Sequence, residues 1–129
     1  MPKPRLPGSK AKVNKLARLL GGRPRALILV HDNPDPDAMA GDLALSRLVD
    51  SFDSTEPLIL YGGIIGRAEN RNMVAALRIP LRAMAEVEVR PDDAVILVDT
   101  QPGFGNNSLP RGADVLGVID HHSARRPIR

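Results

Sequence analysis

A histidine and two aspartates follow directly on an apolar run near the start of the chain. His31, Asp35 and Asp37 come after residues 26–30, whose five apolar side chains predict a fully buried strand. A proline precedes each aspartate, and proline fixes its own φ and favours extended geometry in the residue before it, so this loop is stiff. Imidazole and carboxylate groups are suitable ligands for Mn²⁺, Mg²⁺ or Zn²⁺. The loop therefore predicts a metal site.

Two later apolar runs end in the same kind of side chain. Residues 94–98 are followed by Asp99, and residues 115–119 are followed by Asp120 and two histidines. Taken singly, each group has a structural explanation, such as Asp37 as a helix N-cap or Asp99 as a turn residue. Uncompensated carboxylates at three strand ends would repel one another, however, and bound cations relieve such repulsion. The coincidence favours a shared metal site.

Hydrophobic periodicity predicts the elements that must position these groups. Asp37 is expected to cap the second helix, and residues 81–93 are ambiguous between a short helical turn and a loop. Apolar strands separated by helices predict an α/β fold, with three αβα layers and a mostly parallel sheet. In such sheets ligands bind beyond the carboxyl ends of the strands. The expected helices are 9–20, 37–49 and 68–78, and the expected strands are 26–30, 58–61, 94–98 and 115–119.

Composition limits the class of protein. With 129 residues, 43% of them hydrophobic and 26% charged, the chain predicts one ordinary globular domain. There is no cysteine, so disulfides, thiolate metal sites and cysteine nucleophiles are excluded. No apolar run approaches the length of a membrane span, and no signal-peptide core follows the basic start. We expect a cytoplasmic protein that makes no contact with a membrane.

The charge is unevenly distributed and divides the chain into a basic arm with its helix, 1–25, and a domain, 26–129. The arm holds eight Lys or Arg and no acid, whereas the rest holds ten basic and fifteen acidic side chains. Such an arm could bind RNA, or it could be a solvated helix face or a mitochondrial presequence. Three aromatic residues are too few for a base-stacking platform.

Residues 62–66, Gly-Gly-Ile-Ile-Gly, follow a predicted strand and open a predicted helix. A phosphate could bind at that helix N-terminus. The segment lacks the G-x-G-x-x-G order of a dinucleotide fingerprint, and no Walker A motif is present. A tight turn explains it equally well. Otherwise the loop brings Arg67, Asn70 and Arg71 near substrate phosphates, for which arginine forks are suited.

Together these motifs resemble those of a known family. Three segments resemble the successive motifs of the DHH phosphoesterases, a family that includes RecJ-type exonucleases. They are His31-x-x-x-Asp35-x-Asp37, a later Val98-Asp99, and Asp120-His121-His122. The match covers about residues 24–126. The stretches 66–71 and 98–103 are most similar to the branch of oligoribonucleases and pAp phosphatases. On this resemblance residues 26–129 form a partial, incomplete DHH phosphoesterase domain.

The resemblance implies a site for two Mn²⁺ ions, with Mg²⁺ as the alternative. His31, Asp35 and Asp99 would hold one ion, and Asp37, Asp99 and His121 the other. Two such ions can share a hydroxide nucleophile and neutralise phosphoryl charge. The catalytic residues would be Asp120, which orients His121, and His122, which meets the substrate phosphate.

The implied activity is hydrolysis of phosphodiester or phosphomonoester bonds in short oligoribonucleotides or pAp-like nucleotides. The family has a further metal-ligating aspartate and a smaller second domain, and this sequence stops before both. We therefore expect a truncated form that is weakly active or inactive. Two alternatives stay open. One is an inorganic pyrophosphatase or polyphosphatase of the same superfamily, and the other is a non-catalytic remnant that binds RNA through its basic arm. A homodimer is also left open.

Overall fold

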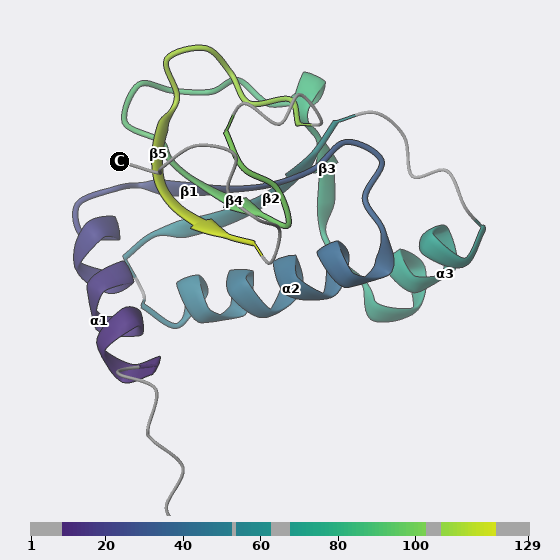
Figure 1. The fold of residues 1–129 in the computed structure, drawn as a ribbon, viewed down its shortest axis with the longest axis horizontal. Coiled ribbons are helices and arrows are strands. Elements are labelled where there is room, and N and C mark those ends of the chain that lie inside the picture. The colour runs from purple at the N-terminus through teal and green to yellow at the C-terminus, as the bar shows by residue number, and fades with distance from the viewer. Residues whose placement is uncertain (1–8, 53, 63–67, 103–106, 121–129) are drawn as a thin grey trace, which may run out of the picture.

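The fold is an α/β domain built on a five-stranded parallel sheet. The computed structural model describes residues 9–52, 54–62, 68–102 and 107–120. Within them the strands lie in the order β3-β2-β1-β4-β5, and every neighbouring pair is parallel. β1 is therefore central, with β2 and β4 on its two sides (Figure 1). The elements are α1 (Ser9–Leu20), β1 (Arg25–Val30), α2 (Pro36–Asp50), β2 (Glu56–Tyr61), α3 (Ala68–Leu77), β3 (Leu81–Ala83), the 3₁₀ turn η1 (Met84–Glu86), β4 (Ala94–Val98) and β5 (Asp114–Ile119).

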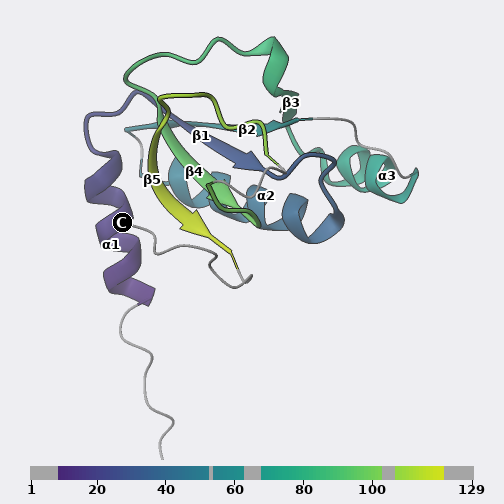
Figure 2. The same cartoon turned by 45° about the horizontal axis from the view of Figure 1, so that its top comes forward.

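Alternate residues of the strands face opposite sides of the sheet. Ala26, Ile28 and Val30 of β1 pack in one buried cluster with residues of α1, α2 and β4. Leu27 and Leu29 belong to a second cluster, which includes residues of η1 and of the segment 109–118. All three helices lie against one side of the sheet, while η1 and long connecting segments cover the other (Figures 1 and 2).

The predicted α/β fold class and its covered parallel sheet are confirmed, with η1 and connecting segments forming the layer on the second face. The expected count of four strands is wrong, because β3 adds a fifth from the ambiguous region 81–93. This strand has three residues and pairs only with β2. Three residues are too short for a periodic pattern to reveal, so the pairing and not the local sequence makes them a strand.

A charged pair fastens β1 to the turn before β4. The Arg25 guanidinium donates to both carboxylate oxygens of Asp93, at 2.9 and 2.6 Å, and the Asp93 side chain is fully buried. This pairing, with a further hydrogen bond from the Arg90 backbone, lowers the pKa of Asp93 below its ordinary value of 3.8.

None of the helices in the described part of the chain has the length and apolar character that a membrane span requires.

Replacing Arg25 with methionine should destabilise the fold. The variant leaves a buried carboxylate without its partner, and we expect a loss of about 3 kcal/mol in the free energy of unfolding at pH 7. Because the pKa of Asp93 is lowered in the folded state, its contribution is present above pH ~4 and is lost as the pH falls below it. Urea unfolding at pH 7 and pH 3 measures both effects. Arg111→Met, at an exposed position, is the control; an equal loss there would contradict the assignment.

Candidate metal centre

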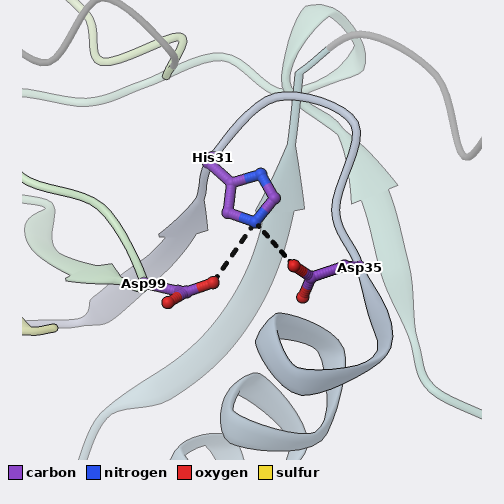
Figure 3. A group of neighbouring side chains, drawn as sticks. All are labelled: His31, Asp35 and Asp99. Carbon is purple, nitrogen blue, oxygen red and sulfur yellow. Dashed lines mark ion pairs between the residues drawn. The ribbon is translucent and has the colours of Figure 1, made fainter. Parts of the chain in front are cut away.

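Three of the predicted ligands meet at the carboxyl edge of the sheet. His31 follows β1 and Asp99 follows β4, and these strands are neighbours paired from Ala26 to Val30. Asp35 lies immediately before α2. Figure 3 shows the two carboxylates on either side of the His31 ring, above the first turns of a helix. The parallel sheet thus brings together side chains that are 68 positions apart in sequence.

The ligand atoms are close enough to share one cation. His31 Nε2 lies 3.3 Å from Asp99 Oδ2 and 3.6 Å from Asp35 Oδ2. One ligand atom from each of the three residues lies within 4.8 Å of the other two. Adjacent ligands of an octahedral ion, each ~2.1 Å from the metal, are ~3 Å apart. One nitrogen and two carboxylate oxygens at these spacings fit a divalent cation such as Mn²⁺ or Mg²⁺.

The backbone presets the His31 ring for metal binding. Its Nδ1 lies 2.9 Å from the carbonyl oxygen of Asp32. A carbonyl oxygen only accepts, so Nδ1 carries the hydrogen and donates it. Nε2 faces both carboxylates and is the ring nitrogen that is placed to bind a cation. A hydrogen bond to the other ring nitrogen is the usual way in which a protein orients a metal-binding histidine.

Asp35 uses its two oxygens for different purposes. Oδ1 accepts a hydrogen bond from the Ala38 backbone N–H at 2.9 Å, which caps α2, and Oδ2 faces His31. The prediction that Asp37 is the N-cap is therefore wrong. Pro36 occupies the first helical turn, where its fixed φ and missing N–H are favourable. The N-cap lies two residues earlier than expected, and the first turn of the helix holds the Asp35 carboxylate in place.

Two residues at this edge have left-handed backbone conformations. Asp99 has φ 58° and Asn33 has φ 57°, a region that asparagine and aspartate enter more readily than most residues. The Asp99 N–H donates to the carbonyl oxygen of Ile119 at 2.8 Å, and the Asn33 N–H donates to that of Gly62 at 3.2 Å. These bonds tie both turns to neighbouring strands. Unusual backbone geometry held in this way clusters at functional sites.

A small polar contact closes the site on the side of β2. Ser108 Oγ donates to Asp32 Oδ1 at 2.7 Å, which joins the loop after β1 to the segment before β5. Gly62, just beyond β2, lies against both groups, and a Cβ at this position would overlap Ser108 Oγ and Asp32 Oδ1. Only glycine leaves room for this contact.

Gly62→Ala should therefore disturb the site. We expect a loss of about 2 kcal/mol in the free energy of unfolding from the forced displacement of packed groups. Mn²⁺ affinity should fall as well, since a shift of Asp32 also moves its carbonyl oxygen, which accepts the hydrogen bond from His31 Nδ1. Thermal unfolding and calorimetric titration measure the two effects. Gly22→Ala, in the turn after α1, has open space around its Cβ but φ 78°; it should cost stability and leave Mn²⁺ affinity unchanged.

The other predicted site residues are only partly described. Asp120 lies just beyond β5, next to β4, and its Oδ2 accepts a hydrogen bond from Gln101 Nε2 at 2.8 Å. Arg71 lies on α3, which Figure 1 shows near the beginning of α2. The side chains of Asp37 and Asn70, and the residues Arg67, His121 and His122, lie outside the described part of the chain.

Sequence reasoning missed a buried carboxyl group, that of Asp42. This residue is on α2 and is 0% exposed. Burial and the charge of Asp99 raise the pKa of Asp42 from 3.8 to about 8. A signal for it exists, because Asp42 interrupts the apolar stripe of α2 formed by Ala38, Met39, Leu45 and Val49.

The fold and the three ligands define this chain as an α/β domain with a candidate cation site at the carboxyl edge of its sheet. No protein-family model matches the chain. It is similar to the uncharacterized protein MJ1633 of Methanocaldococcus jannaschii, with 35% identity over 98 residues. The similarity covers 75% of this chain and 20% of that protein. The chain thus matches about a fifth of the length of this relative.

Proposed function

We propose that this chain carries part of the catalytic domain of a DHH-type phosphoesterase. It would hydrolyse phosphodiester or phosphomonoester bonds in short oligoribonucleotides or pAp-like nucleotides. The observation that supports this best is the convergence of His31, Asp35 and Asp99 within 4.8 Å at adjacent strand ends. The orientation of the His31 ring adds to it, because the hydrogen bond from Nδ1 to the Asp32 carbonyl oxygen turns Nε2 toward the two carboxylates.

In this proposal the three described ligands hold one Mn²⁺ or Mg²⁺. Asp99 would be shared with a second ion held by Asp37 and His121. Two such ions supply a hydroxide nucleophile and neutralise charge on the phosphoryl group. Asp99 is suited to sharing because its backbone is anchored to β5 through Ile119 while its side chain is 14% exposed.

The remaining residues would act on the substrate and on the ligands. Asp120 would orient His121, and its hydrogen bond from Gln101 fixes the position of its carboxylate. His122 would contact the substrate phosphate. Arg67, Asn70 and Arg71 would bind further phosphates of the nucleotide, with arginine as the anion-binding fork. The beginning of α3 lies at the same end of the domain as the beginning of α2 (Figure 1).

Metal binding and hydrolysis test the proposal together. Calorimetric titration of the 129-residue chain with Mn²⁺ should show saturable binding that His31→Ala weakens strongly. With Mn²⁺ present, a 5′-phosphorylated RNA dinucleotide and pAp should be hydrolysed more slowly by His31→Ala than by the unaltered chain. Cleavage of pyrophosphate alone would favour the pyrophosphatase alternative. Absence of saturable Mn²⁺ binding would contradict the proposal.

RNA binding is a second candidate function, and the charge of α1 supports it. Lys10, Lys12, Lys15 and Arg18 are all exposed on α1, which contains no acidic residue. The end of α1 lies at the amino edge of the sheet, where Thr55 Oγ1 donates to the Leu20 carbonyl oxygen. Figure 1 shows α1 beside the end of α2, whereas Asp35 lies immediately before the beginning of α2. RNA bound there would be separate from the catalytic site. The affinity of the chain for RNA should fall as the salt concentration rises, and it should fall in the double variant Lys12→Glu/Lys15→Glu. His31→Ala should leave the affinity for RNA unchanged.

A further inference from the structure

Asp42 is a buried acid without a partner. Its side chain is 0% exposed, and neither carboxyl oxygen has a hydrogen-bond partner. These two oxygens are the unpartnered buried side-chain polar atoms identified within the described residues. Desolvation of a carboxyl group that gains no hydrogen bond or opposite charge is costly. A group of this kind calls for an explanation such as a bound ion.

Asp93 shows what a structural buried acid looks like in this fold. It is 2% exposed, but both of its oxygens are bonded to Arg25 and the backbone of Arg90 also donates to it. The pKa of Asp93 is lowered, whereas the pKa of Asp42 is raised. The fold thus satisfies one buried carboxylate with a cation from its own chain and leaves the other without one.

The helix brings the turn that holds Asp42 to the end of β4, next to Asp99. Asp42 lies seven positions after Asp35, the N-cap of α2, which is close to two turns and so on the same side of the helix. A Cβ added at the preceding Gly41 would lie 3.4 Å from Val98 Cγ1. This turn of α2 therefore packs on the last residue of β4, immediately before Asp99. The Asp99 carboxylate is near enough for its charge to act on Asp42.

We propose that Asp42 belongs to the metal centre and supplies a further carboxylate, from its buried side, to a divalent cation bound at Asp99. The cation would be of the hard, oxygen-preferring class, such as Mn²⁺ or Mg²⁺. It provides the opposite charge that Asp42 lacks in the protein alone. This inference rests on the metal centre of the proposed function and adds to it a residue outside the resembling motifs.

Asp42→Asn tests the proposal, because asparagine keeps the shape of the side chain and removes its charge. We expect Mn²⁺ to bind about tenfold or more weakly to this variant in calorimetric titration. In EDTA the variant should unfold at the same or a higher urea concentration than the unaltered chain. Asp42→Ser provides a smaller uncharged side chain for the same two measurements. Ser46→Ala, one turn further along α2 at a buried position, should leave Mn²⁺ affinity unchanged.

The outcomes separate this inference from the proposed function. Saturable Mn²⁺ binding by the unaltered chain with equal affinity in Asp42→Asn would overturn the role of Asp42 and leave the three-residue centre intact. Failure of both Asp42 variants to fold in EDTA would also overturn it, since the carboxyl group would then be required by the fold itself. Absence of Mn²⁺ binding by the unaltered chain would overturn both proposals.

Discussion

Asp99→Asn should weaken Mn²⁺ binding by at least ~100-fold. This loss of affinity is larger than the loss expected when a group that only orients a ligand is replaced. Asp99 Oδ2 lies 3.3 Å from His31 Nε2, and Asp99 is the ligand that the proposal assigns to both ions. Asparagine keeps the volume of the side chain but removes its negative charge. Phosphoesterase activity should fall in parallel. Calorimetric titration with Mn²⁺ and hydrolysis of an RNA dinucleotide measure the two effects.

The same substitution should leave the metal-free fold intact. Asparagine tolerates the left-handed backbone at this position, where φ is 58°. Asp99→Ala provides a contrast, because alanine is less suited to that backbone and should cost ~1 kcal/mol of stability as well as the metal. Asp114→Asn on the exposed start of β5 is the matched control. Unchanged Mn²⁺ affinity in Asp99→Asn would exclude Asp99 as a ligand.

The convergence of the ligands was predictable from general rules of chain folding. The strands at 26–30 and 94–98 are apolar throughout, which predicts a parallel sheet covered on both faces. Parallel strands end at one edge, so His31 and Asp99 were expected there, and the structure brings them together. What the sequence does not contain is the strand order. That β1 lies between β2 and β4 follows from tertiary packing, and the short distance between the ligands depends on it.

The local errors have physical causes. Asp37 was predicted to cap α2 because it precedes the apolar stripe, but Pro36 favours the first helical turn and moves the cap to Asp35. Asp42 was overlooked because one acid within a helix suggests a solvent-exposed position. Its burial becomes evident only once β4 is packed against that turn of α2, next to Gly41. The proposed roles of His121 and His122 stay predictions.

The second large effect that we expect is a dependence of stability on pH that originates at Asp42. Burial and the charge of Asp99 raise its pKa from 3.8 to about 8 in the metal-free fold. Between these two values the folded chain keeps a proton that the unfolded chain has released. The free energy of unfolding therefore falls as the pH rises through this window. The slope from this one group approaches ~1.4 kcal/mol per pH unit, and below pH ~4 or above pH ~8 its contribution is constant.

Asp42→Asn removes the titrating carboxyl group and keeps the size of the side chain. Urea unfolding in EDTA at pH 5 and pH 8 should show the variant gaining stability relative to the unaltered chain by on the order of 4 kcal/mol between the two pH values. A constant difference would mean that the carboxyl group is not held protonated by burial. Adding Mn²⁺ at pH 8 should reverse the order, since a ligand that binds only the folded state stabilises it. A carboxyl group that destabilises the metal-free fold and stabilises the loaded one links folding to cation supply.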